Sequence, residues 1–220
     1  QITQEAMRLV KGKAISIEAE IGCLGSLETG LSGEEDGTQA KERLSVSQLL
    51  TDPKEAQCFV KNTNVHALAV AIGTSHGAYK FSSPPSEDVL NIQRVQEIHQ
   101  VIPNTPLVLH GSSSVPKHLL DGINHHGGDI PQTYGVPVAA IQQAIEFGVA
   151  KVNIDTDLRL ACTLAVRETL QNTPSEFDPR SYLKLAYSYM KQVCTERYIA
   201  FGSKGQAKYI IGEQHETHYA

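Results

Sequence analysis

Four short, almost entirely apolar runs are the feature that most limits how this 220-residue chain can fold. They are AISIEAEIG at 14–22, ALAVAIG at 67–73, PLVLHG at 106–111 and VAKVNIDT at 149–156. Short apolar runs bounded by turn-forming residues predict buried strands. Segments with helical periodicity lie between them, and strands that alternate with helices predict an α/β fold with a parallel sheet made of βα units.

Capping residues mark the clearest helices. An aspartate followed by a proline is typical of a helix start, and this pair occurs at Asp52–Pro53 and at Asp178–Pro179. The aspartate accepts hydrogen bonds from the unpaired amides of the first turn, and proline fits the first helical position. Helices are expected at 1–13, 52–60, 89–101, 137–148, 157–171 and 178–201. The polar, glycine-rich segment 24–43 predicts a long loop, and long loops in compact domains often act as active-site lids.

No domain boundary is visible, so we expect one unit over residues 1–202 and a tail over 203–220. The tail has no packing pattern, and His215 and His218 are expected to belong to a frayed terminus rather than to a metal site. The chain opens at Gln1 within a helical pattern, which we interpret as the start of a fragment.

Composition excludes several classes of protein. The chain has 24 acidic and 19 basic residues and a net charge of −5, without the basic patch that nucleic-acid binding requires. No apolar run approaches the ~18–20 residues of a membrane span, and no signal peptide is visible. The four cysteines form no CxxC pair, which favours free thiols in a reducing compartment, the cytoplasm. A small-molecule partner is therefore expected.

Polar residues at the strand ends predict a metal site. Side chains alternate along a strand, so Glu18 and Glu20 share the face opposite Ile17 and Ile21, where two carboxylates must be paired, hydrogen-bonded or bound to a cation. One interpretation is an internal salt bridge. A single histidine at the end of a strand is more often a structural residue than a metal ligand. With His76 and His110 after the next two strands, however, Glu20 completes a His/His/carboxylate set of the kind that binds zinc, with polar atoms expected ~3–6 Å apart.

The same strand ends suggest a phosphate site. Residues 111–114, GSSS, offer unobstructed backbone amides and hydroxyl groups, and Gly77 with Lys80 offers a second such turn. Asn153 and Asp155 share one face of the last strand. In a β/α barrel, a phosphate site commonly forms after the last two strands.

The motifs IEAEIGCLGSLETG, GEEDG, AVAIGTSHGAYKF, HGSSSVP, TYGVPVAAIQQAIEFGVAKVNIDTDLRLA and FDPRSYLK follow one another in order. From about residue 13 to 209, the chain resembles class II, metal-dependent fructose-1,6-bisphosphate aldolase, especially the subtype of cyanobacteria and other Calvin-cycle bacteria. The resemblance implies a TIM (β/α)8 barrel of which this chain supplies strands five to eight.

The resemblance also implies roles for individual residues. His76 and His110 match zinc ligands, and Glu20 matches the carboxylate at an alternative or second metal position, which takes a divalent or monovalent cation. Glu35 in GEEDG matches a mobile-loop acid that assists proton transfer, and Arg180 in FDPR resembles an arginine that reaches the far phosphate across a subunit interface, which implies a homo-oligomer. The matches to dihydroxyacetone-phosphate contacts are Gly77, Gly111, Ser112, Ser113, Asn153, Ile154, Asp155 and Thr156.

One family motif has no counterpart. The family's third zinc histidine and its proton-donating aspartate lie in an HxDH-type segment of the third strand, and the nearest sequence here, HH at 125–126, precedes GGD in a different context.

The activity implied is reversible cleavage of fructose 1,6-bisphosphate to dihydroxyacetone phosphate and glyceraldehyde 3-phosphate through a zinc-stabilised enediolate, in glycolysis, gluconeogenesis and the Calvin cycle. Three alternatives stay open. The substrate could be tagatose 1,6-bisphosphate or another ketose bisphosphate, and the chain could be an inactive half-barrel that lacks the catalytic aspartate and third histidine. A Schiff-base mechanism through Lys151, which shares the parity of Asn153, is also compatible with the strand pattern.

Overall fold

The computed structural model describes residues 1–24, 49–74, 81, 83–85 and 89–209. Its centre is a parallel sheet in the order β1-β2-β3-β4, so that each strand pairs with the next one along the chain. The strands are β1 (Glu18–Ile21), β2 (Ala67–Val70), β3 (Leu107–Leu109) and β4 (Val149–Val152). The predicted α/β class is confirmed, and each strand occupies only part of its apolar run.

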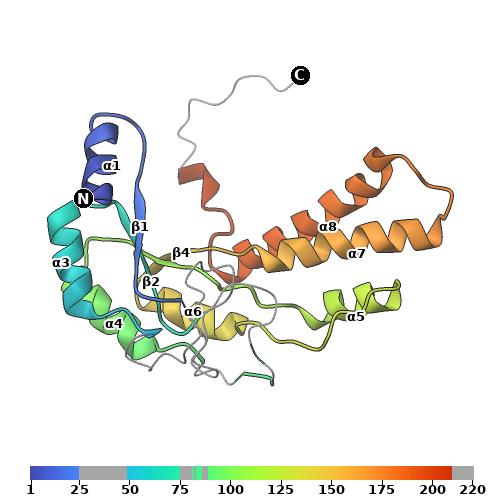
Figure 1. The fold of residues 1–220 in the computed structure, drawn as a ribbon, viewed down its shortest axis with the longest axis horizontal. Helices are drawn as coiled ribbons and strands as arrows, with labels where there is room; N and C mark the ends of the chain where they lie inside the picture. The colour runs from blue at the N-terminus through green and yellow to red at the C-terminus, as the bar shows by residue number, and fades with distance from the viewer. Residues whose placement is uncertain (25–48, 75–80, 82, 86–88, 210–220) are drawn as a thin grey trace.

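Helices connect the strands, as the alternating pattern predicts (Figure 1). They are α1 (Ile2–Val10), α3 (Pro53–Thr63), α4 (Ile92–Val101), α5 (Lys117–His125), α6 (Val138–Glu146), α7 (Thr156–Asn172) and α8 (Pro179–Ala200). A 3₁₀ turn, η3 (Ala207–Tyr209), lies in the segment expected to be a tail, and residues 210–220 are outside the described part of the chain. The long loop expected at 24–43 lies, except for Leu24, outside it as well.

The aspartate caps form as expected. The carboxylate of Asp52 accepts hydrogen bonds from the amides of Lys54 and Glu55, both at 2.9 Å. Asp178 accepts from the amide of Arg180 at 3.0 Å. The local sequence therefore determines where α3 and α8 begin.

The helix α5 is absent from the sequence-based expectation. Its N-terminus has no side-chain cap, and it contains Gly122, a residue with low helix propensity, so both local signals of a helix are weak. Packing supplies what the local sequence lacks: Leu119, Leu120 and Ile123 are buried in a cluster with residues of α7 and α8. A side chain on Gly122 would meet the methyl groups of Leu164 at 2.8 Å, which shows how closely α5 and α7 approach.

Two apolar clusters stabilise the fold. The first joins β2, β3 and β4 to the helices α3, α4 and α6, with fully buried residues such as Leu68, Leu107 and Ile141. The second joins α5, α7 and α8, and α7 and α8 form an arm that projects from the sheet (Figure 1). No helix in the described ranges is long and apolar enough to cross a membrane.

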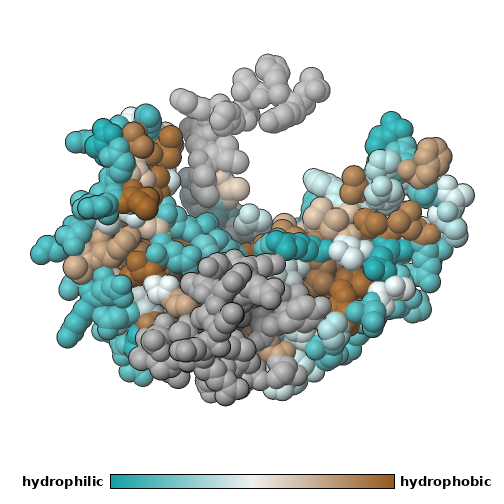
Figure 2. Space-filling model, viewed as in Figure 1, coloured by the Kyte–Doolittle hydropathy of each residue, from teal (hydrophilic) through white to brown (hydrophobic). Residues whose placement is uncertain are grey.

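Some apolar side chains lie on the surface. Figure 2 shows them over α1 and along the α7–α8 arm. Ile2 and Leu9 on α1 are 89% and 55% exposed, and Phe177 between α7 and α8 is 89% exposed.

Candidate active site

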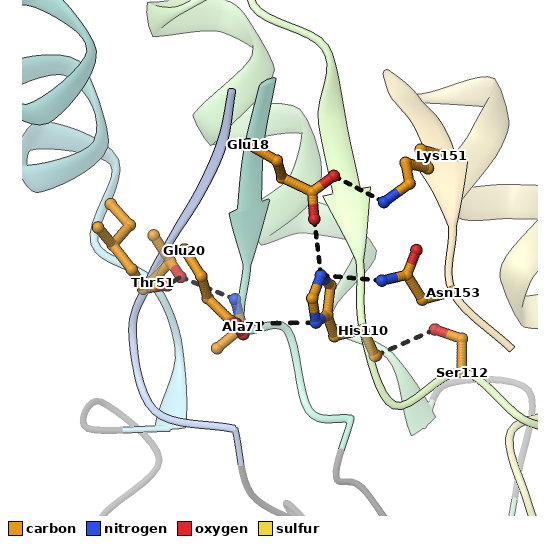
Figure 3. A network of polar contacts seen from close by, with 9 residues as sticks. Glu18, Glu20, Thr51, Ala71, His110, Ser112, Lys151 and Asn153 are labelled. Atoms are coloured by element: carbon orange, nitrogen blue, oxygen red, sulfur yellow. Dashed lines mark hydrogen bonds and ion pairs between the residues drawn. The ribbon is translucent and has the colours of Figure 1, made fainter. Parts of the chain in front are cut away.

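The His110 side chain lies at the centre of a polar cluster at the carboxyl end of the sheet (Figure 3). It directly follows β3, and its Nε2 atom is 2.9 Å from Oε1 of Glu18 and 3.1 Å from Nδ2 of Asn153. Its Nδ1 atom faces Oε2 of Glu20 at 3.7 Å. The contacts come from β1 and from the residue after β4, so three strands together position this ring.

Glu18 links the two outer strands of the sheet. Its second carboxylate oxygen is 2.7 Å from Nζ of Lys151 on β4. Since β1 and β4 are not neighbours in the sheet order, this contact requires the sheet to curve until its outer strands face each other across the interior. The internal salt bridge considered for the carboxylate pair is therefore present at Glu18.

Burial and hydrogen bonds both shift the pKa of the Glu18 carboxyl group. Partial burial, with 27% of the side chain exposed, raises the pKa. The hydrogen bonds from Lys151 and His110 lower it and outweigh the burial, so that the pKa of Glu18 lies below its ordinary value. Glu18 is thus a carboxylate, an acceptor toward both partners, at neutral pH.

The donors at Glu20 and His110 fit part of a zinc site. Two atoms bonded to one zinc at ~2.0–2.2 Å in near-tetrahedral geometry lie ~3.3–3.6 Å apart, and the Nδ1–Oε2 distance is 3.7 Å. The third expected ligand, His76, is outside the described residues. Within the described ranges, no group of three or more His, Cys, Asp or Glu side chains could hold a metal ion.

Backbone amides of the turn after β4 donate hydrogen bonds to the loop after β3. The hydroxyl of Ser113 accepts from the amides of Asp155 and Thr156 at 3.2 and 3.1 Å. The hydroxyl of Ser112 donates to the carbonyl of His110 at 3.2 Å. Gly111, with φ of 62°, allows the sharp turn between His110 and these serines. The predicted phosphate-contact residues of both strands are therefore adjacent.

Asp157, in the first turn of α7, holds the loop after β3 in place through hydrogen bonds. It is fully buried, and its carboxylate accepts from the amides of Ser114 at 3.2 Å and Val115 at 2.8 Å. Arg197 on α8 donates to the same carboxylate at 3.1 Å. Gly135 approaches from the other side, where a Cβ atom would lie 2.4 Å from the carbonyl oxygen of Ser113. The loop is thus fixed by α7, α8 and the segment before α6.

The remaining predicted residues have different surroundings. Ile154 is half-buried, and Asp155 is exposed and pairs with Arg159 at 2.6 Å. Arg180 lies at the start of α8, in the arm, with 90% of its side chain exposed, and pairs with Asp178. The structure does not bring Arg180 to the His110 cluster. Gly77, Lys80 and Glu35, like His76, lie outside the described residues.

Sequence reasoning did not single out Thr51. Its buried hydroxyl donates to the carbonyl of Ile21 at 2.8 Å and accepts from the amide of Ala71 at 2.8 Å, and its carbonyl accepts from Arg94. Thr51 thereby joins the ends of β1 and β2 on the side from which Glu20 projects (Figure 3). A threonine before the Asp52 cap shows no pattern that could have identified this role.

The fold and the cluster together define an aldolase-like β/α half-barrel with polar side chains at the carboxyl ends of its strands. The chain belongs to the family of class II fructose-bisphosphate aldolases, whose family model matches residues 1–206.

Two curated relatives and a solved structure agree with this membership. A fructose-bisphosphate aldolase of Stutzerimonas stutzeri is 57% identical over 96% of this chain and 59% of its own length. One from a Nostoc species is 56% identical over 98% of this chain and 60% of its own. The YdjI aldolase of Escherichia coli K12 superposes with a TM-score of 0.63 at 28% identity, over 94% of this chain and 56% of its own. This chain therefore spans about three-fifths of the length of these relatives.

Proposed function

We propose that this chain carries the metal and phosphate sites of a ketose-bisphosphate aldolase, and that the complete site cleaves fructose 1,6-bisphosphate reversibly to dihydroxyacetone phosphate and glyceraldehyde 3-phosphate. The observation that carries the proposal is the placement of His110 and Glu20, 3.7 Å apart, beside the interlocked loops after β3 and β4. The high identity to proteins named fructose-bisphosphate aldolase favours this substrate over tagatose 1,6-bisphosphate.

His110 and Glu20, with His76, would hold zinc, and the bound ion supplies a positive charge that polarises the ketone carbonyl. A further divalent or monovalent cation near Glu20 is part of the same proposal. The chain's own contribution is to orient these donors on strands whose positions are fixed by the buried core.

One phosphate of the substrate binds between Gly111–Ser113 and Asn153–Thr156 in this proposal. The N-terminus of α7, a helix of 17 residues, directs its positive dipole end toward this position. The neighbouring carboxylates do not oppose an anion with full charge, because Asp155 pairs with Arg159 and Asp157 pairs with Arg197. This pairing supports a phosphate site.

The other assignments complete the proposal. Glu35 assists proton transfer, and Arg180, exposed in the arm, reaches the far phosphate of a neighbouring subunit in a homo-oligomer. We place the reaction in the cytoplasm, in glycolysis, gluconeogenesis and the Calvin cycle.

The experiment joins this chain to the N-terminal part of the Stutzerimonas stutzeri aldolase that precedes the matched region, and follows fructose 1,6-bisphosphate cleavage with a coupled dehydrogenase. We expect the chimera to turn over, EDTA to abolish the activity and Zn²⁺ to restore it. The 220-residue chain alone should show no turnover, since no HxDH-type segment occurs in it. A folded, zinc-loaded chimera that cleaves only tagatose 1,6-bisphosphate, or neither sugar, would contradict the proposal.

The Schiff-base alternative makes a different prediction. Imine formation requires a neutral lysine amine, whereas the ammonium group of Lys151 is bonded to Glu18 at 2.7 Å. Borohydride in the presence of substrate should therefore leave the chimera active. Inactivation with incorporation of substrate at Lys151, detected by peptide mass spectrometry, would establish the Schiff-base mechanism instead.

A further inference from the structure

We propose that Thr51 is a positioning residue for the cleavage reaction, because its buried hydroxyl holds the carboxyl ends of β1 and β2 apart and so sets the position of Glu20. The inference rests on the proposed function, to which it adds a residue outside the predicted site. Thr51 comes directly before the aspartate cap of α3, and its hydroxyl lies between the two strand ends.

The hydroxyl of Thr51 interrupts the pairing of β1 with β2. Ile21 ends β1 opposite Val70, so the next bond of a parallel ladder would run from the Ala71 amide to the Ile21 carbonyl. Both groups bind the hydroxyl instead, which donates to the carbonyl and accepts from the amide, each at 2.8 Å. Two such bonds at one near-tetrahedral oxygen separate the amide nitrogen from the carbonyl oxygen by about 4–5 Å, whereas a direct bond separates them by ~2.9 Å. The hydroxyl is therefore a spacer between the strand ends.

Backbone contacts fix Thr51, so its hydroxyl cannot turn away from the gap. The Thr51 amide donates to the Ala71 carbonyl at 2.9 Å, and the Thr51 carbonyl accepts from the guanidinium of Arg94 at 2.8 Å. Arg94 in turn pairs with Glu97 on α4 at 3.0 Å. Thr51 is only 1% exposed, so bulk water does not compete for its hydroxyl.

Gly22 leaves room for this hydroxyl. It directly follows Ile21 and has φ of 95°, a conformation that favours glycine. A Cβ atom at Gly22 would lie 2.5 Å from the hydroxyl oxygen of Thr51 and 3.0 Å from the Cβ atom of Ala71. A larger residue would therefore push the hydroxyl out of the gap.

The spacer acts on the site through Glu20, which lies one residue before the interrupted pair. The carboxylate of Glu20 faces Nδ1 of His110 at 3.7 Å, beside Thr51 and Ala71 (Figure 3). Without the hydroxyl, a direct bond would draw the end of β1 toward β2 by roughly 1–2 Å. Misplacing a group of an active site by ~1 Å can cost ~100-fold in rate. The proposed phosphate loops follow β3 and β4, so substrate binding should change less than turnover.

The kinetic test uses the chimera described above and two variants that differ by a single hydroxyl. Thr51→Ser keeps the hydroxyl and loses the methyl group, whereas Thr51→Ala loses both. We expect kcat for fructose 1,6-bisphosphate cleavage to fall ~10–100-fold in Thr51→Ala, with little change in KM, and to stay near the unmodified value in Thr51→Ser. Thr63→Ala is the matched control and should leave kcat unchanged, because Thr63 is also a buried threonine whose hydroxyl donates to a carbonyl, that of Phe59 within α3.

The structural test does not depend on turnover. Crystal structures of the chimera and of its Thr51→Ala variant give the distance from the Ala71 nitrogen to the Ile21 oxygen, which should shorten from about 4–5 Å to about 2.9 Å. Equal distances in the two structures would overturn the spacer role. Equal kcat values of Thr51→Ala and Thr51→Ser would overturn the positioning role.

If Thr51→Ala does not fold, Thr51→Val replaces it in the kinetic comparison, since valine keeps the volume of threonine and lacks the hydroxyl. A kcat of Thr51→Val equal to that of Thr51→Ser would overturn the proposal in the same way. A folded chimera that cleaves no sugar bisphosphate would refute the proposed function and with it the role of Thr51 in the reaction. The distance between Ala71 and Ile21 would still decide whether the hydroxyl is a spacer.

Discussion

The surroundings of Asp157 illustrate how a single residue can organise a site without lying in it. The carboxylate is fully buried at the first turn of α7 and accepts from two loop amides and from Arg197. A buried carboxylate is stable only when it is paired and hydrogen-bonded, and here three donors, two from the loop after β3 and one from α8, meet that condition.

Replacing Asp157 by alanine should therefore destabilise the chain strongly. The change leaves the guanidinium of Arg197, which is 14% exposed, without its partner and two amides without an acceptor, and breaking a largely buried pair in this way costs ~3–5 kcal/mol. Urea denaturation followed by circular dichroism measures the loss in the free energy of unfolding. The control is Asp121→Ala on α5, whose exposed pair with Lys117 should contribute less than about 1 kcal/mol. Similar losses in the two variants would show that Asp157 has no special role.

At the scale of elements, the α7–α8 arm is stabilised by a buried cluster and by hydrogen bonds between its helices, of which the bond from Arg197 to Asp157 is one and a tyrosine–glutamate bond is another. The hydroxyl of Tyr189 on α8 donates to Oε2 of Glu168 on α7 at 2.7 Å. This bond, together with partial burial and the negative charge of Glu168, raises the pKa of Tyr189.

The raised pKa predicts how the arm responds to alkali. A group whose pKa is raised by folding stabilises the folded state below its unfolded pKa, here ~10, and this contribution is lost as the pH rises through the folded pKa. Between about pH 9 and 12, the unfolding free energy of the unmodified chain should fall relative to that of Tyr189→Phe. Tyr187→Phe, a change at a 66% exposed tyrosine on the same helix, is the control and should follow the unmodified chain. Parallel pH curves for the unmodified chain and Tyr189→Phe would refute this account.

Element positions also show what local sequence can predict. The strands, and the helices with aspartate caps, form where expected, because alternation, apolar runs and caps are local properties. The helix α5 could not be predicted in this way, since Gly122 and the missing cap weaken its local signal and only packing against α7 and α8 makes it favourable.

At the scale of the whole molecule, the described residues form a curved sheet whose outer strands each have one neighbour. In this part of the chain, β1 pairs only with β2, and β4 pairs only with β3. A groove of about 400 Å³ runs beside β4, with Val152, Val193 and Phe201 among its lining residues. Unpaired parallel edges and exposed apolar surface favour association.

The 220-residue chain expressed alone should therefore self-associate. Sedimentation equilibrium at ~1–100 µM, a range in which such surfaces associate, should show a mass that rises with concentration. The double variant Ile2→Glu, Leu9→Glu places charge on the exposed apolar face of α1 and should reduce the association. An unmodified chain that stays monomeric over this whole range would show that the strand edges and apolar faces do not drive self-association.

The sequence by itself determined the α/β class, the alternation of strands and helices, and the position of polar residues at the strand ends, because these follow from side-chain periodicity within a few residues. It also placed Glu18, Glu20 and Lys151 on particular strand faces. Only the tertiary structure decided that Glu18 contacts both His110 and Lys151, 92 and 133 residues away in the sequence. The curvature that brings β1 opposite β4 arises from the packing of all the strands and helices together, so no short stretch of sequence encodes it.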